Sequence, residues 1–185
     1  MSRDLADLDP VFLADVLRLY EACLRRGVTM RPFSTLRDPW EQARIWRSSR
    51  SSRQVRQAVE TLRAAGAAFL ADVLESVGPQ AARGRGHLTN ALPGNSWHQW
   101  ALAIDNYWLA DVDGDGDGDA VWSAETKIGG VNGYQVYREE AMRLGLHRAG
   151  RSDWPHTQGP KDSSPRASGL TWAQIDAEMQ ARFGP

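Results

Sequence analysis

His98 and Asp105 lie seven residues apart in an otherwise apolar run that extends from residue 96 to residue 105. An imidazole nitrogen and a carboxylate oxygen are both good zinc donors, and a catalytic zinc usually takes three protein ligands and one water. The pair is therefore a candidate metal site that needs a third ligand from elsewhere in the chain. On residue types and spacing alone, a buried strand with one hydrogen-bonded histidine and an aspartate at the strand's end explains the same pattern.

The spacing of this pair constrains the backbone between the two residues. In one flat strand, two residues separated by an odd number of positions point to opposite faces. We therefore expect a bend or a bulge between His98 and Asp105, with a loop over residues 96–100 and a strand that includes residues 103–105.

The pattern of Ser96, His98, Ala101, Ala103 and Asp105 resembles the first zinc motif of the D-alanyl-D-alanine carboxypeptidase and L-alanyl-D-glutamate endopeptidase family. These are peptidoglycan-cutting zinc peptidases that include VanY-like enzymes and phage endolysins, and hedgehog-type signalling domains resemble their fold. The family has a glycine at the position of Ala101. If the backbone requires a positive φ there, an alanine costs roughly 1 kcal/mol more than a glycine.

Asp153 and His156 belong to an Asp-x-Pro-His-x-Gln sequence that resembles the second zinc motif of the same family. The resemblance implies that His156 is the third zinc ligand and that Asp153 is the general base. The full set then holds one zinc ion per chain, with water in the fourth position. Thr157 departs from the aromatic residue that the family has after this histidine. His87 and His147 are alternative candidates for the third ligand.

Arg37 comes just before a helix that we expect to start at Asp38-Pro39, because an aspartate followed by proline is typical of a helix N-terminus. In the family that the chain resembles, an arginine in this place faces the substrate, which implies substrate-binding roles for Arg37, Gln42 and Ser96. A guanidinium can bind a carboxylate or stabilise an oxyanion, so Arg37 is also a catalytic candidate. A surface arginine at the end of a strand is the structural alternative.

The resemblance implies an α+β fold, in which a small antiparallel sheet carries the zinc site and helices flank it. We expect a single zinc peptidase domain over residues 1–185, with a helical insertion at 52–80 and a helical tail at 160–185. The implied activity is hydrolysis of a peptidoglycan stem-peptide amide bond, either L-Ala-D-Glu or D-Ala-D-Ala, by a monomer that could serve as a phage endolysin. A non-catalytic zinc-containing binding domain of the same fold is the alternative.

Composition limits the classes of function. A chain of 185 residues with 42% hydrophobic residues has the size of one globular domain. The net charge of −1 argues against a surface built to bind nucleic acid. Five arginines recur at intervals of three residues: Arg44, Arg47, Arg50, Arg53 and Arg56. On a helix they would point around most of the circumference and form no single stripe. DNA binding by these arginines is an alternative function.

The first ten residues lack the basic start and the apolar core of a signal peptide, and no run approaches the ~18 apolar residues of a membrane helix. We therefore expect no membrane span and synthesis in the cytoplasm. A protein made there reaches the cell wall through lysis, a holin-type pore or a dedicated secretion device. Cys23 is the single cysteine, so no intramolecular disulfide forms, and its place on an apolar helical stripe predicts a buried residue.

Apolar periodicity and capping residues predict the remaining elements. We expect helices from Pro10 to about residue 26, over 54–77 with Gly66 as an interior weak point, over 134–144, and from Thr171 as N-cap toward residue 183. We also expect a short strand over 28–30.

Alternating aspartates and glycines from Asp111 to Asp119 resemble a calcium-binding loop, because calcium prefers several carboxylate oxygens on a tightly turned backbone. The bidentate glutamate that closes such a loop is missing: counted from Asp111 the twelfth residue is Trp122, and Glu125 comes too late. The pattern favours a flexible acidic hairpin loop that is not needed for the chemistry, and Ca²⁺ binding is the alternative.

Overall fold

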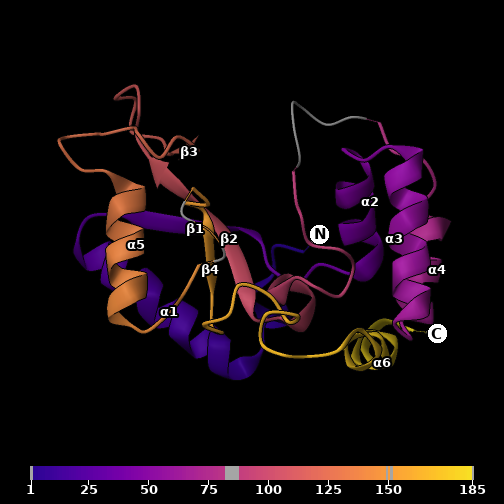
Figure 1. Ribbon diagram of the computed structural model, residues 1–185. Helices are drawn as coiled ribbons and strands as arrows, with labels where there is room; N and C mark the ends of the chain where they lie inside the picture. The colour runs from indigo at the N-terminus through magenta and orange to yellow at the C-terminus, as the bar shows by residue number, and fades with distance from the viewer. Residues whose placement is uncertain (1, 82–87, 149, 151, 185) are drawn as a thin grey trace. The chain divides into compact units, whose positions relative to one another are not determined.

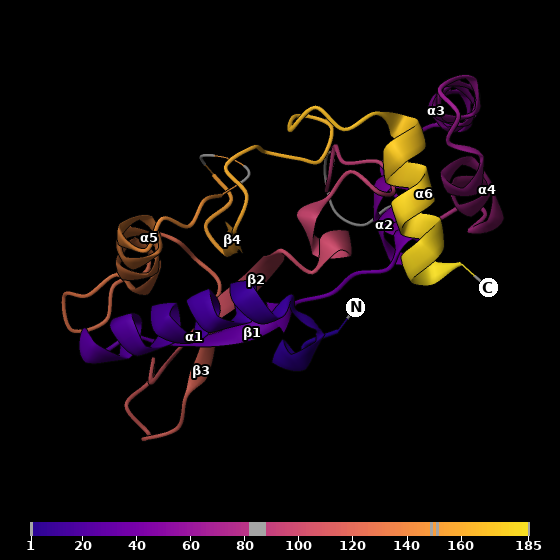
Figure 2. The ribbon, with the colours of Figure 1, turned by 90° about the horizontal axis from the view of Figure 1, so that it is seen from below.

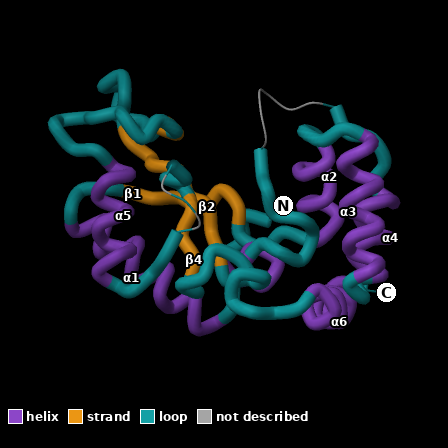
Figure 3. Tube along the Cα trace, viewed as in Figure 1, coloured by secondary structure: helices purple, strands orange, loops and turns teal. Residues whose placement is uncertain are grey.

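The computed structural model describes residues 2–81, 88–148, 150 and 152–184, and the chain divides into two compact units. The first unit comprises Met1–Leu36 and Trp100–Ser163, and the second comprises Arg37–Gln99 and Ser164–Pro185. Helices and a small antiparallel sheet of four strands make the fold α+β, which confirms the expected class (Figures 1 and 3).

The first unit contains the whole sheet. Its elements are η1 (Leu5–Asp7), α1 (Pro10–Arg25), β1 (Thr29–Ser34), β2 (Ala103–Ala110), β3 (Asp119–Val121), α5 (Gly133–Arg143) and β4 (His156–Gln158). The second unit contains α2 (Pro39–Arg47), α3 (Ser52–Ala64), α4 (Ala68–Ser76) and α6 (Trp172–Phe183). The short helix η2 (Trp97–Trp100) includes the point at which the chain passes from the second unit to the first.

Strand β2 is the centre of the sheet and pairs antiparallel with each of the other three strands. Its first half pairs with β4, so that Asp105 lies directly opposite His156. Its second half pairs with β3, while β1 follows its other edge with an irregularity between Pro32 and Ser34. β1 is longer than the strand expected over 28–30, because its pairing with β2 continues past Pro32.

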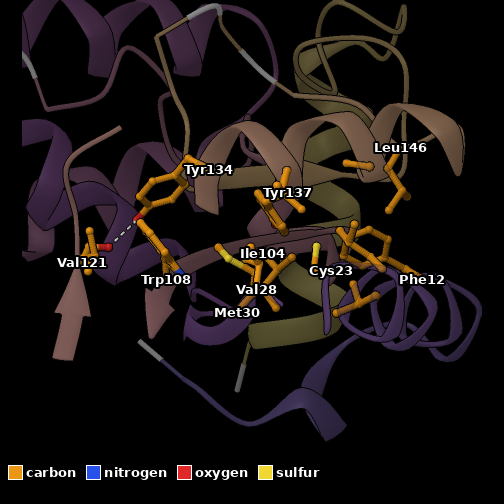
Figure 4. Packing of buried hydrophobic residues seen from close by; sticks show 14 of the residues in the cluster. Phe12, Cys23, Val28, Met30, Ile104, Trp108, Val121, Tyr134, Tyr137 and Leu146 are labelled. Carbon is orange, nitrogen blue, oxygen red and sulfur yellow. Dashed lines mark hydrogen bonds between the residues drawn. The ribbon is translucent and has the colours of Figure 1, made fainter. Parts of the chain in front are cut away.

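The two faces of β2 differ in burial. Ile104, Asn106 and Trp108 are buried, whereas Asp105 and Tyr107 are only partly buried, as expected for side chains that alternate between faces. The buried face belongs to the core, which also contains the inward residues of α1 and α5 (Figure 4). Helix α1 runs alongside β1, as Figure 2 shows. The sheet therefore has one face packed by these helices and another that carries Asp105.

Local chemistry explains where the first helices begin and end. The Asp9 carboxylate accepts hydrogen bonds from the backbone N–H groups of Val11 and Phe12, and Pro10 is the first residue of α1. Asp38 caps α2 in the same way. Cys23 is fully buried on the inner stripe of α1, and burial raises the pKa of its thiol to about 12, so it is no nucleophile at neutral pH.

The prediction of one helix over residues 54–77 is wrong. The chain forms α3 and α4 instead, with a break at residues 65–67, where Gly66 has a φ of 77°. Glycine adopts this left-handed conformation without the penalty that other residues have, so the predicted weak point is where the helix ends. The break lets the apolar faces of α3 and α4 pack in the same unit, with Leu62 and Leu70 fully buried.

Helix α6 supplies the N-terminal cap of α4. The N-cap residue of α4, Ala67, makes no side-chain hydrogen bond, and the buried carboxylate of Asp176 accepts hydrogen bonds from the N–H groups of Phe69 and Leu70 at 3.3 and 2.7 Å. Thr171 is the N-cap of α6, as expected, and it forms a capping box with Gln174. Within the described residues, no helix is long and apolar enough to cross a membrane.

Candidate metal centre

His98 lies on η2 and is buried, and the backbone bends between this helix and β2. The bend is at Ala101, whose φ of 60° is in the left-handed region that favours glycine. The expected bend between His98 and Asp105 is therefore confirmed. The bend occurs at the position where the first zinc motif of the resembled family has a glycine. The turn therefore has a left-handed conformation that costs alanine roughly 1 kcal/mol more than glycine.

Asp105 and His156 form the half of the site that lies on the sheet. The two residues are directly opposite in the β2–β4 ladder, and Nδ1 of His156 is 3.0 Å from Oδ1 of Asp105. Two ligands of one tetrahedral zinc ion, each about 2.0 Å from the metal, are roughly 3.3 Å apart. The pair has a separation close to that of two ligands of one ion.

Gln158 fixes the orientation of the His156 ring. Its side-chain Nε2 donates hydrogen bonds to the carbonyl oxygens of Pro160 and Asp162, both at 2.8 Å, which directs its Oε1 toward the ring. The Nε2 atom of His156 lies 3.0 Å from that oxygen. With the proton on Nε2, the lone pair of Nδ1 is directed at the Asp105 side, as a metal-ligating histidine requires.

Both ring nitrogens of His156 thus face acceptor oxygens, whereas a neutral imidazole has one N–H group. Burial by itself lowers the pKa of His156, but the hydrogen bond with Asp105 and the negative charges of Asp105 and Asp153 outweigh burial and raise the pKa. A second proton on Nδ1, which the raised pKa favours, satisfies this arrangement. A cation coordinated between Nδ1 and the carboxylate satisfies the same geometry.

His98, Asp105 and His156 each offer one ligand atom, and these atoms all lie within 4.8 Å of one another. His98 is connected to β2 by a few residues of η2 and the bend at Ala101, so the association depends on local backbone. Two imidazoles and one carboxylate form a donor set that suits zinc and leaves a coordination position for water. The residues therefore fit the metal that the sequence predicted.

A cavity of about 250 Å³ lies in the first unit beside the sheet half of the site. Asp153 and His156 line it, and the negative charge of Asp153 acts on His156. Arg138, which stacks over the ring of Trp154 at 5.0 Å, lines the cavity together with Arg148 and Lys161. Asp153 is exposed at this cavity, where a substrate could reach it.

A buried polar network supports the two ligand strands from the core face. Asn106 donates from Nδ2 to the hydroxyl of Tyr137 at 2.6 Å, and its Oδ1 accepts a hydrogen bond from the hydroxyl of Tyr20. Its backbone N–H donates to the carbonyl of Pro155 at 3.0 Å. Burial raises the pKa of Tyr20 and of Tyr137, so both hydroxyls keep their protons. The residues next to Asp105 and His156 are therefore joined by hydrogen bonds.

Three residues predicted to bind substrate or act in catalysis belong to the second unit. Arg37 donates its backbone N–H to the carbonyl of His98 at 3.3 Å and its side-chain Nη1 to Oε1 of Gln42 at 3.0 Å. Gln42 is fully buried and donates to the carbonyl of Ala91 at 2.7 Å. Ser96 is partly buried at the start of η2. The backbone hydrogen bond places Arg37 next to His98. The catalytic role of Arg37 and the substrate-binding roles of Arg37, Gln42 and Ser96 stay predictions.

The alternative third ligands have different positions. His87 lies outside the described residues. His147 forms a backbone bridge with Gln158, and among the described residues it is not part of the cluster that contains His156. The sequence alone predicts no role for Gln158, although this residue ends the Asp-x-Pro-His-x-Gln motif. Its position two residues after His156 in a strand, on the same face, was the signal that could have assigned it.

The acidic residues from 111 to 118 connect β2 and β3, which confirms the hairpin. Asp111, Asp113 and Asp115 also offer carboxylate oxygens within 4.8 Å of one another, but all three side chains are exposed. Asp111 accepts hydrogen bonds from the backbone N–H groups of Gly114 and Gly116, so the loop turns around its own first aspartate. Calcium binding here stays an untested alternative.

Comparison with known proteins gives one family. The family model VanY, D-alanyl-D-alanine carboxypeptidase, matches residues 6–113, which is more than half of the chain. The matched range includes Arg37, Ser96, His98 and Asp105, whereas His156 follows it. A search of curated proteins finds no match.

Proposed function

Because the chain belongs to the VanY family of D-alanyl-D-alanine carboxypeptidases, we propose that it is a zinc-dependent peptidase that hydrolyses an amide bond in the stem peptide of peptidoglycan. The observation that carries the proposal is the close approach of one ligand atom each from His98, Asp105 and His156. Asp153 adds a carboxylate beside this set. A metal-binding set with an adjacent base is what amide hydrolysis by a zinc peptidase needs.

Each residue then has a distinct task. His98, Asp105 and His156 hold the zinc, which when bound lowers the pKa of its water and polarises the scissile carbonyl. Asp153 accepts the proton of the attacking water and delivers it to the leaving amine. Gln158 keeps the Nδ1 lone pair of His156 directed at the metal position.

In this proposal Arg37 and Ser96 bind the substrate next to His98. The Arg37 guanidinium pairs with a stem carboxylate or with the developing oxyanion. Gln42 contributes by holding Arg37, since it is buried and accepts a hydrogen bond from that guanidinium. The substrate is rich in carboxylates, which suits a cationic side chain at this place.

Two stem bonds are candidates for hydrolysis: the D-Ala-D-Ala bond, which the family description names, and the L-Ala-D-Glu bond. A phage endolysin role extends the same proposal. The protein then acts on the wall after release by lysis, a holin-type pore or a secretion device.

The test combines metal analysis with product analysis. Purified protein should contain about one zinc per chain, and digestion of purified peptidoglycan should give muropeptides whose masses identify the cut bond. Activity that persists after exhaustive chelation would refute the zinc peptidase. Zinc binding without hydrolysis of any wall polymer would instead identify a zinc-containing binding domain of the same fold.

A further inference from the structure

Three aromatic side chains lie together beside the sheet of the first unit. Trp122 follows β3 directly, and its ring centroid is 4.8 Å from that of Phe33 on β1, with the two planes at 80°. The centroid of Tyr107 on β2 is 5.5 Å from the same indole, with an interplanar angle of 35°. We call these three residues the aromatic platform. Their mutual contacts hold the rings in fixed orientations.

The platform is open to solvent at Trp122, whereas Phe33 and Tyr107 are partly buried. Trp122 has a relative exposure of 48%, and it is the only aromatic residue among the exposed large hydrophobic residues in the described part of the chain. Keeping much of an indole in water forfeits the free energy that its burial provides. Contiguous apolar surface is more typical of a binding site than a single exposed side chain, and the three rings are contiguous.

The platform continues the face that carries the metal ligands. Tyr107 is two residues after Asp105 on β2, so both side chains point away from the core. Two residues of a strand span about 7 Å. His156 shares this face, because it is directly opposite Asp105. A substrate bound at the ligands therefore extends over the platform if it follows β2 toward its C-terminal end.

Guanidinium groups border the aromatic rings. Arg3 lies over the ring of Phe33 at 5.2 Å, and Arg31 is the register partner of Tyr107 in the β1–β2 ladder. Arg31 is exposed and on the same face as Tyr107. The platform thus combines an apolar ring surface with N–H donors at its edge.

We propose that the aromatic platform binds a sugar ring of the glycan strand that carries the cleaved stem peptide. A pyranose has an apolar face of C–H groups, which packs on the electron-rich face of an aromatic ring, and a polar edge of hydroxyl and amide groups for the guanidinium donors. The inference rests on the proposed function, because the stem peptide of peptidoglycan is joined to a glycan strand.

The reach of the stem peptide specifies the bond. The L-Ala residue joins the stem to the sugar, so the L-Ala-D-Glu bond is one residue of about 3.5 Å and a short linker away from the ring, which matches the separation of the platform from Asp105. The D-Ala-D-Ala bond is three residues, or about 10 Å, farther from the sugar. If the platform binds the sugar that carries the cut stem, we expect cleavage of the L-Ala-D-Glu bond.

A titration with N-acetylglucosamine tetramer tests the binding without any hydrolysis. NMR of the indole N–H groups of the whole protein monitors the titration. The Trp122 resonance, assigned by its absence from Trp122→Phe, should shift and saturate. Trp172, a partly buried tryptophan on α6, is the matched control. Its resonance, assigned by its absence from Trp172→Phe, should not shift. No shift of the Trp122 resonance up to the solubility of the sugar overturns the proposal, whatever the enzyme hydrolyses.

Kinetics on two substrates complete the test. The ratio of kcat/KM for a sugar-linked stem peptide to kcat/KM for the same peptide without sugar should fall about tenfold in Trp122→Ala, less in Trp122→Phe, and not in Trp172→Phe. An unchanged ratio in Trp122→Ala, or products released only by D-Ala-D-Ala cleavage, would overturn the proposal. If neither substrate is cut by the wild type, the peptidase function fails and the NMR titration alone decides the platform.

Discussion

The described residues contain two groups of three potential metal ligands, which differ in their surroundings and in their donor atoms. His98, Asp105 and His156 bring their ligand atoms within 4.8 Å of one another, and so do Asp111, Asp113 and Asp115. The first group is mostly buried and mixes nitrogen and oxygen donors. The second is exposed and entirely carboxylate.

The difference lies in what holds the side chains in place. His156 is positioned by a strand ladder and by Gln158, whose amide is itself fixed by two carbonyl groups. The aspartates of the loop accept hydrogen bonds only from the backbone of the same loop, as far as the described contacts show. Proximity of donors is therefore a weak indicator of a metal site, and preorganisation by neighbouring residues is the stronger one.

Removal of a histidine ligand gives the largest contrast between the two groups. His98→Ala should lose both zinc and hydrolysis, since two remaining ligands hold the metal poorly. Asp113→Ala in the loop should retain both. Metal analysis and peptidoglycan digestion of the two variants check this, and a zinc-loaded His98→Ala would break the comparison.

Asp153→Asn separates the base from the ligands. The variant should keep its zinc and its fold but lose about 10²–10⁴-fold in peptidoglycan hydrolysis, which is the usual contribution of a general base. Metal content and turnover are measured on the same preparation. Equal turnover by wild type and variant would show that Asp153 is not the base.

Gln158→Leu removes the acceptor for His156 Nε2–H while leaving every ligand in place. Zinc affinity, measured by competition with a chelator, should fall about 10–100-fold. Gln158→Glu keeps an acceptor oxygen and should lose less affinity than Gln158→Leu. Equal affinity in all three proteins would mean that Gln158 does not position the ring.

Ala101→Gly tests the turn that carries His98. Because Ala101 has a φ of 60°, glycine should raise the free energy of unfolding by about 1 kcal/mol. Denaturant unfolding of the metal-free protein measures the change. A decrease in stability would show that the alanine methyl group contributes packing that exceeds the backbone cost.

Replacement of Asp111, Asp113 and Asp115 by asparagine should have the smallest effect, with zinc content and hydrolysis unchanged. Calorimetry with calcium supplies the second readout. Tight calcium binding by the wild type, together with loss of hydrolysis in the triple variant, would make the loop a functional metal site like the cluster of His98, Asp105 and His156.

The sequence was sufficient for features that depend on short spacings. Asp9-Pro10 and Asp38-Pro39 predicted helix starts that the structure confirms. The odd spacing of His98 and Asp105 predicted a bend between them, which the structure has at Ala101. The α+β class and the family followed from the motifs and are confirmed.

Features that depend on distant residues were not predictable. A glycine inside an apolar period is compatible with a continuing helix, so Gly66 could not reveal that α3 and α4 are separate. The contacts of Gln158 with Pro160 and Asp162 depend on how the chain turns after β4, and no periodicity encodes that turn. The catalytic and substrate-binding roles of Asp153, Arg37, Gln42 and Ser96 stay predictions.

The Asp176 carboxylate has a consequence for the order of folding during synthesis. It caps the first turn of α4 from a position 106 residues later in the chain, so a growing polypeptide completes α4 long before its cap emerges from the ribosome. By then all segments of the unit that carries Asp105 and His156 have already been made. The sheet can therefore assemble first, while the helical unit waits for the residues of α6 to be translated.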